Sequence, residues 1–152
     1  MPAIHSIDHD AKLIATLWSG STTDRELSEA LSQYHRQIRE FDYVSYNQLL
    51  DFSGVESIHI TVAGIRHLAH TAVGTDVAGR RTKLAIVVDR PVAFGLARMY
   101  ATYRGLVPGQ SKEVAVFRER GEALDWLNGT GAVDEGPAAA RRGTKGRAGN
   151  GS

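Results

Sequence analysis

One apolar run constrains the fold of this chain more than any other feature. Residues 84–88 read Leu-Ala-Ile-Val-Val without a polar interruption and are followed at once by Asp89 and, two residues later, by Pro91. A strand of this composition is buried on both faces, as in a parallel sheet covered by helices, so we expect a central strand over Lys83 to Val88. Asp89 can cap a following helix and Pro91 suits its first turn, which predicts a helix that ends near Arg104.

Strands and helices alternate around this unit. Two short β-like runs separated by turn residues predict an antiparallel hairpin, and Thr23 with Glu26 has the spacing of a capping box at the start of a helix. The expected strands cover Ala3 to Ile7, Lys12 to Trp18, Tyr43 to Phe52, Lys83 to Val88 and Val114 to Phe117, and the expected helices begin after Thr23, near Thr61, at Pro91 and at Gly121. The order β-β-α-β-α-β-α-β-α predicts an α/β fold with a mixed, mostly parallel five-stranded sheet flanked by helices.

Composition divides the chain into a domain over residues 1–128 and a tail over residues 129–152. The tail is dominated by Gly, Ala and charged residues and has no aromatic residue, so we expect it to be disordered. It holds four of the 18 basic and two of the 17 acidic residues, which leaves 14 bases and 15 acids in the domain. A near-neutral domain lacks the basic face of dedicated nucleic-acid binders, so we expect no specific nucleic-acid partner.

The absence of cysteine and of long apolar runs limits the possible chemistry and the cellular compartment of the protein. The chain has no cysteine, which excludes disulfides, thiolate nucleophiles and thiolate zinc sites. No apolar run approaches the ~18 residues of a membrane-spanning helix, and residues 1–10 contain no hydrophobic signal region. We therefore expect a cytoplasmic protein without a transmembrane segment.

The sequence also lacks the common catalytic motifs. It contains no Gly-x-Ser-x-Gly elbow, no Gly-Lys-Ser/Thr of a phosphate-binding loop and no His-Glu-x-x-His of a zinc protease. His67 and His70 lie three residues apart on a predicted helix, but no third metal ligand stands out, and we interpret both as exposed side chains. We therefore expect no enzymatic activity, no cofactor and no metal.

Several polar residues remain as candidate binding residues. Asp51 and Asp89 follow predicted parallel strands, where open α/β sheets place their sites, although a turn and a helix cap explain them more simply. Ser53 lies in the same turn as Asp51, without a base nearby in sequence. Arg80 and Arg81 can bind an anionic ligand or an acidic surface, and a solvated loop is the simpler interpretation of both.

Five segments give the chain a family resemblance. They are Asp51-Phe52-Ser53-Gly54-Val55, Lys83 to Asp89, Ala93 to Tyr100, Val114 to Arg118 and Glu122 to Leu127. The first resembles the strand-to-helix segment of STAS domains, the anti-sigma-factor antagonist fold, and the others resemble the bacterial SpoIIAA-like group. The resemblance covers residues 3–128 in element order and implies a regulatory module that acts through a protein partner or through self-association.

The resemblance also bears on regulation by phosphorylation. The resemblance implies that, in the phospho-switched STAS antagonists, a partner kinase modifies a serine. This serine lies within an Asp-Ser-Ser-Gly stretch at the start of the second helix. The corresponding residues here are His59, Ile60, Thr61 and Val62, so the acceptor position holds an isoleucine. We expect the usual switch to be absent and interpret Thr61 as a helix cap, with a phosphate on Ser57 or Thr61 as the alternative.

A further similarity implies a second class of function. The SpoIIAA-like group is similar in outline to the lipid-binding SEC14 type, in which an apolar ligand lies between the sheet and the helices. This similarity implies a carrier for a lipid or another small apolar ligand. A hydrolase is the least favoured hypothesis for this chain. The residues that could line such a cavity are Phe94, Met99, Tyr100, Tyr103 and Trp126, although their helical spacing is more typical of a core.

Overall fold

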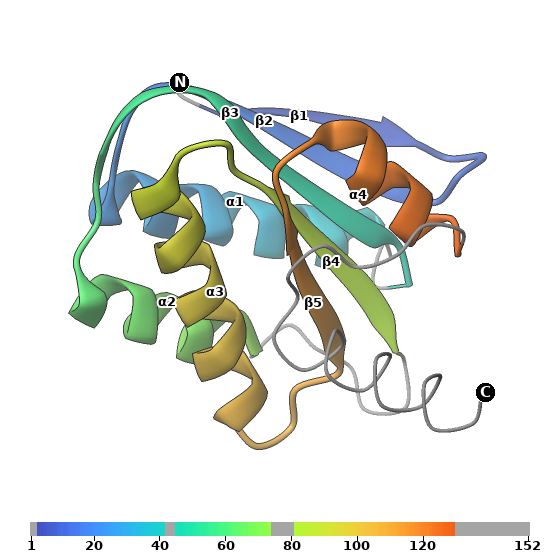
Figure 1. Cartoon of the computed structure of the whole chain (residues 1–152). Helices are drawn as coiled ribbons and strands as arrows, with labels where there is room; N and C mark the ends of the chain where they lie inside the picture. The colour runs from blue at the N-terminus through green and yellow to red at the C-terminus, as the bar shows by residue number, and fades with distance from the viewer. Residues whose placement is uncertain (1–2, 42–44, 74–80, 130–152) are drawn as a thin grey trace, which may run out of the picture.

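The computed structural model describes residues 3–41, 45–73 and 81–129 of the chain (Figure 1). The elements in chain order are β1 (Ala3–Asp8), β2 (Leu13–Thr23), α1 (Asp24–Phe41), β3 (Asn47–His59), α2 (Val62–Val73), β4 (Thr82–Val87), α3 (Pro91–Leu106), β5 (Lys112–Phe117) and α4 (Arg120–Leu127). The strands form one sheet in the order β1-β2-β3-β4-β5, antiparallel between β1 and β2 and parallel at the other pairings. The predicted α/β class, element order and mixed five-stranded sheet are confirmed.

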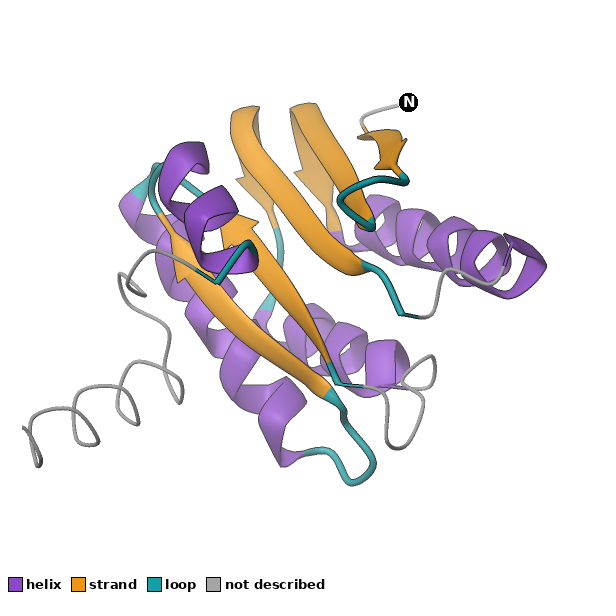
Figure 2. Cartoon of the chain, turned by 90° about the vertical axis from the view of Figure 1, so that its right-hand side faces the viewer, coloured by secondary structure: helices purple, strands orange, loops and turns teal. Residues whose placement is uncertain are grey.

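Helices cover the two faces of this sheet unequally. α1, α2 and α3 lie on one face, and α4 lies on the other, as Figures 1 and 2 show. On the α4 face, Val87 and Phe117 of the strands pack with Trp126. On the opposite face, Ile86 of the sheet packs with Phe94 of α3. Strand β4 therefore contributes to the core on both faces, as its unbroken apolar sequence predicts.

The first elements follow their local sequence signals. β1 pairs antiparallel with β2, which confirms the predicted hairpin. The Thr23 N–H donates to Glu26 Oε1 at 3.0 Å, and the Glu26 N–H donates to Thr23 Oγ1 at 3.2 Å. This reciprocal pair is a capping box, and α1 begins at Asp24 as predicted. The predicted end of the second strand at Trp18 is wrong, because β2 continues to Thr23.

The third strand also continues past its predicted end. We predicted a strand over Tyr43 to Phe52 that closes in a turn, whereas β3 runs on to His59. Relative to β2, it carries one extra residue between Asp51 and Gly54, which is a β-bulge. The Ser53 N–H and hydroxyl donate to Asp51 Oδ1 at 2.9 and 2.6 Å within this bulge. The polar residues that suit a turn therefore bend the strand here without ending it.

The two helices that follow β3 and β4 begin differently. The Gly64 N–H donates to Thr61 Oγ1 at 2.9 Å, which confirms Thr61 as the cap of α2. The predicted cap at Asp89 is wrong, because the residue that precedes α3 is Arg90 and no side chain caps the helix there. Asp89 lies one residue too early in the chain and its side chain is exposed. Pro91 does occupy the first turn of α3, as predicted.

Two expectations concern the limits of the domain. No helix among the described residues is long and apolar enough to cross a membrane. The predicted tail lies almost entirely within residues 130–152, outside the described residues, so its disorder stays a prediction.

Candidate functional site: an apolar cavity beneath three helices

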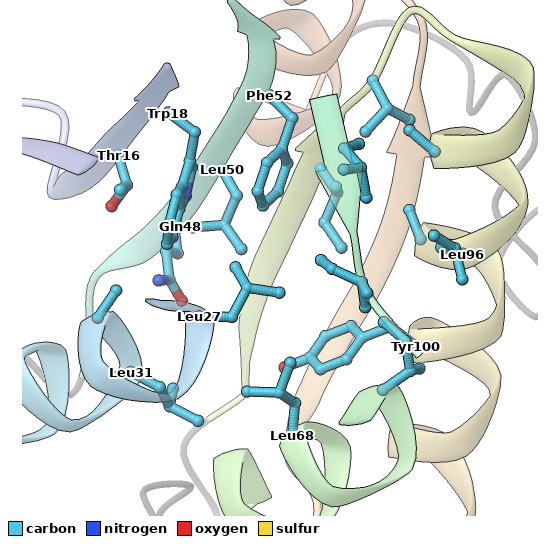
Figure 3. A pocket seen from close by; sticks show the side chains of 18 of the residues that line it. Thr16, Trp18, Leu27, Leu31, Gln48, Leu50, Phe52, Leu68, Leu96 and Tyr100 are labelled. Atoms are coloured by element: carbon cyan, nitrogen blue, oxygen red, sulfur yellow. The ribbon is translucent and has the colours of Figure 1, made fainter. Parts of the chain in front are cut away.

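A cavity of about 120 Å³ lies between the sheet and helices α1, α2 and α3 (Figure 3). Aliphatic and aromatic side chains make up most of its wall. The sheet side and its extensions contribute His5, Thr16, Trp18, Gln48, Leu50, Phe52, Ile58, Ile60, Ile86 and Val88, and the helices contribute Leu27, Ala30, Leu31, Tyr34, Ile65, Leu68, Ala93, Leu96, Ala97 and Tyr100. Every helix on this face of the sheet therefore contributes to the wall.

Alternation along β2 and β3 supplies the sheet side of the cavity. Side chains two residues apart in a strand share a face, which brings Thr16 and Trp18 together on β2. The same spacing brings Gln48, Leu50 and Phe52 together on β3. The rings of Trp18 and Phe52 stack with centroids 5.3 Å apart and an interplanar angle of 17°. The stacked pair forms a flat aromatic part of the wall.

Small residues on the helices leave the space open. Ala93 and Ala97 lie four residues apart on one face of α3, and Ala30 faces the cavity from α1. Each of these side chains is a single methyl group, so the helix backbones approach the cavity without filling it. A larger residue at Ala97 would occupy part of this volume.

Few polar groups border the cavity. His5 Nδ1 and Thr16 Oγ1 lie 2.8 Å apart and are hydrogen bonded. Burial lowers the pKa of His5 below its ordinary value of 6.5, so the ring is neutral at neutral pH. Gln48, only 7% exposed, adds a carboxamide. The lining residues include no Lys, Arg, Asp or Glu, so the cavity is apolar and without formal charge.

Comparison with known proteins adds one decisive observation. No family model and no curated protein matches the chain. The solved structure of an uncharacterized DUF3478-family protein with a SpoIIAA-like fold, from Shewanella loihica PV-4, is similar over 82% of this chain and 91% of that one. The TM-score is 0.51 and the sequence identity is 14%. The chain has a SpoIIAA-like fold. At this identity the likeness extends to the fold alone.

The residues proposed from sequence as cavity lining take different places in the SpoIIAA-like fold. Tyr100 lines the cavity, whereas Phe94, Met99 and Tyr103 are not among the lining residues. Phe94 is buried in the core between α3 and the sheet. Trp126 lies across the sheet, in the core beneath α4. Helical spacing alone therefore did not distinguish cavity from core.

Asp51 and Ser53 lie together, on the opposite face of the sheet from the cavity. Arg120, at the start of α4, donates from Nη1 to Asp51 Oδ2 at 2.9 Å. Burial alone raises the pKa of Asp51, but hydrogen bonds from the Ser53 hydroxyl, the Ser53 N–H and Arg120, together with the Arg120 charge, bring it below its usual value. The carboxylate therefore stabilises the β3 bulge and joins it to α4.

Thr61 joins the starts of two helices. Its hydroxyl donates to Asp24 Oδ2 at 2.7 Å, and its N–H donates to Asp24 Oδ1 at 3.1 Å. The same carboxylate lies so close to Gly64 that a Cβ there would clash with it. Ile60, which the sequence resemblance aligns with the acceptor position of the phospho-switched antagonists, contributes to the apolar wall of the cavity.

The remaining candidates lie away from the cavity or outside the described residues. Arg80 falls within the segment that is not described, and Arg81 is exposed directly before β4. Asp89, His67 and His70 are exposed. Within the described part of the chain, no group of three or more His, Asp or Glu side chains could hold a metal ion.

Sequence reasoning missed the polar side chains that border the cavity. Thr16 and Gln48 are polar residues at strand positions that face the helices, and both are buried. The period-two set Ile14, Thr16 and Trp18 could have placed Thr16 on a core-facing side. No sequence pattern indicates that the same face leaves an unfilled space.

Proposed function

We propose that this chain is a non-catalytic binding domain that holds a small, predominantly apolar molecule in the cavity between the sheet and helices α1, α2 and α3. The observation that carries the proposal is an apolar cavity of about 120 Å³, partly open to the surface, between the sheet and three helices. Cores rarely keep a void larger than a water molecule, because the unfilled volume forfeits packing contacts. A binding function accounts for keeping such a void.

The volume limits the size of the molecule. An engineered apolar cavity of about 150 Å³ stays dry and binds benzene. A cavity of about 120 Å³ therefore suits a molecule with a single ring or a short branched chain. A long acyl chain is larger than this volume, so a small apolar ligand is a better occupant than a membrane lipid.

The proposed function is non-catalytic because the reactive side chains lie away from the cavity or are already hydrogen bonded. Asp51, Ser53 and Arg120 cluster on the α4 face of the sheet, away from the cavity. Within the cavity, the ionisable ring of His5 is neutral and bonded to Thr16. These placements support binding over covalent chemistry in the cavity.

Toluene binding provides the test. Toluene should shift the NMR signals of methyl groups that line the cavity, and the Kd should be measurable by titration. Ala97→Leu should abolish this binding because it fills the space from α3, whereas Ala63→Leu, which adds the same atoms at an exposed position on α2, should bind toluene like the wild type. If the wild-type protein binds neither toluene nor other apolar molecules of this size, the proposal is wrong.

A second candidate, a protein-interaction module, has an observation of its own. Ile4 on β1 and Leu17 on β2 oppose each other in the hairpin and are 64% and 46% exposed. β1 is an edge strand, whose outer backbone groups can pair with the same strand of a second copy. We therefore take a homodimer as the form of this candidate.

Sedimentation velocity distinguishes this second candidate. A dimer that forms through β1 should dissociate in Leu17→Lys and persist in Val92→Lys, which places the same charge on an exposed valine of α3. A wild-type protein that stays monomeric at all accessible concentrations would exclude the homodimer.

A further inference from the structure

We infer that the occupant of the cavity is a neutral molecule with one hydrogen-bonding group, which the side-chain amide of Gln48 recognises. The inference rests on the proposed binding function and specifies the ligand class. It follows from one buried polar side chain and from the absence of formal charge around it.

Gln48 occupies a fixed position in the sheet. It lies on β3, opposite Ile14 of β2 and Leu84 of β4, so hydrogen-bonded strands hold its backbone on both sides. Its side chain lines the cavity, and Figure 3 shows the amide directed toward the helix that carries Leu27 and Leu31. The residue is only 7% exposed, although its amide atoms keep some contact with solvent, unlike His5 Nε2 and Trp18 Nε1 in the same wall.

The amide lacks a protein partner. Among residues 3–41, 45–73 and 81–129, no hydrogen bond joins the Gln48 side chain to another residue. Most buried polar side chains in native structures are hydrogen bonded, because leaving a buried donor or acceptor unsatisfied is costly. A carboxamide offers two N–H donors and one carbonyl acceptor. A ligand hydroxyl or amide can satisfy it from inside the cavity.

Other polar groups lie near Gln48, and two of them, His5 Nε2 and the Trp18 indole N–H, are buried without a hydrogen-bond partner in the described part of the chain. The hydroxyl of Thr16 is already hydrogen bonded to His5 Nδ1 at 2.8 Å. The hydrogen bond joins these two side chains on neighbouring strands, β1 and β2. The Trp18 indole can only donate, whereas the Gln48 amide offers a ligand both donors and an acceptor.

The charge of the wall sets the charge of the ligand. The lining residues include no Lys, Arg, Asp or Glu, and burial keeps His5 in its neutral form. An ionised group placed in an apolar site without a counter-charge loses its hydration and gains nothing in exchange. Carboxylates, phosphates and ammonium groups are therefore excluded from this cavity, whereas a phenol or a small neutral amide fits.

Phenol, toluene and benzoate test the inference, because they share a ring and differ in the polar group. The protein is titrated with each at pH 7, where phenol is neutral and benzoate is charged. Gln48→Met keeps the length of the side chain and removes its hydrogen-bonding groups, and Gln33→Met makes the same change on α1 away from the cavity. We expect Gln48→Met to raise the ratio of the phenol Kd to the toluene Kd roughly five- to tenfold, and Gln33→Met to leave it unchanged.

A second measurement uses the wild-type protein alone. The side-chain amide resonances of Gln48 should shift more with phenol than with toluene, and benzoate should not bind. If toluene and phenol both fail to bind, the proposed function falls with the inference. If both bind and neither the ratio nor the Gln48 resonances respond, or if benzoate binds as well as phenol, the inference is wrong and the proposed function stands.

Discussion

Filling the cavity should make the protein more stable while it removes binding. An enclosed apolar cavity costs about 24 cal/mol for each Å³, so 120 Å³ that is partly open to the surface corresponds to at most about 3 kcal/mol of lost stability. Ala97→Leu adds three carbon atoms from a buried position that lines this space. We expect it to recover about 1–2 kcal/mol of the free energy of unfolding, because the new side chain fills only part of the volume.

Urea denaturation and thermal unfolding measure this change. A gain of 1 kcal/mol should raise Tm by roughly 4 °C in a domain of this size. The matched control is Ala101→Leu, one turn further along α3, where the alanine is equally buried but does not line the cavity. There the larger side chain should destabilise the fold by about 1–3 kcal/mol through overpacking. Equal destabilisation by both substitutions would show that the space beside Ala97 is already filled, and would refute the reasoning.

Three further changes test other contacts. Asp51→Asn should lower the free energy of unfolding at pH 7 by about 1–2 kcal/mol in urea denaturation, because it weakens the hydrogen bonds to Ser53 and to half-exposed Arg120. Because the pKa of Asp51 lies below its usual value, this difference from the wild type should vanish as the pH falls through the lowered pKa. Because burial lowers the pKa of His5, the unfolded chain takes up a proton first as the pH falls through 6.5, so stability should decline from pH 7 to 5 and decline less in His5→Gln. Gly64→Ala should break the Asp24 bonds to Thr61, because its Cβ displaces the Asp24 carboxylate, and this loss should offset the ~1 kcal/mol that alanine gains over glycine in a helix; a Tm above that of the wild type would contradict this account.

The parts of the fold that were predicted correctly depend on residues close together in sequence. Thr23 and Glu26 form the capping box within one helical turn, and their spacing alone predicts where α1 begins. The unbroken run in β4 predicts burial on both faces because a strand has only two faces to cover. Such signals need no knowledge of the rest of the chain.

The errors arose where one local sequence fits two structures. Asp51 and Ser53 make the same hydrogen bonds in a turn and in a bulge, and only the neighbouring strand β2 decides that β3 continues. Asp89 is a residue type that often caps helices, but α3 begins one residue too late for the Asp89 side chain to reach the backbone N–H groups of its first turn.

The cavity could not be predicted from the sequence, for a different reason. It exists because three helices and the sheet meet at a distance that small residues such as Ala93 and Ala97 do not bridge. No periodic pattern encodes that distance. The sequence did predict Tyr100 among the candidate binding residues, but it gave no reason to choose Gln48.

The order of the strands has a consequence for how the domain is made. Each strand lies beside its predecessor in the chain, so a polypeptide that emerges from the ribosome can add β2 to β1, β3 to β2 and so on without inserting a late strand between earlier ones. The cavity wall runs from His5 to Tyr100. The nascent chain can therefore enclose a ligand only after α3 has been synthesised, when nearly all of the sheet is already assembled.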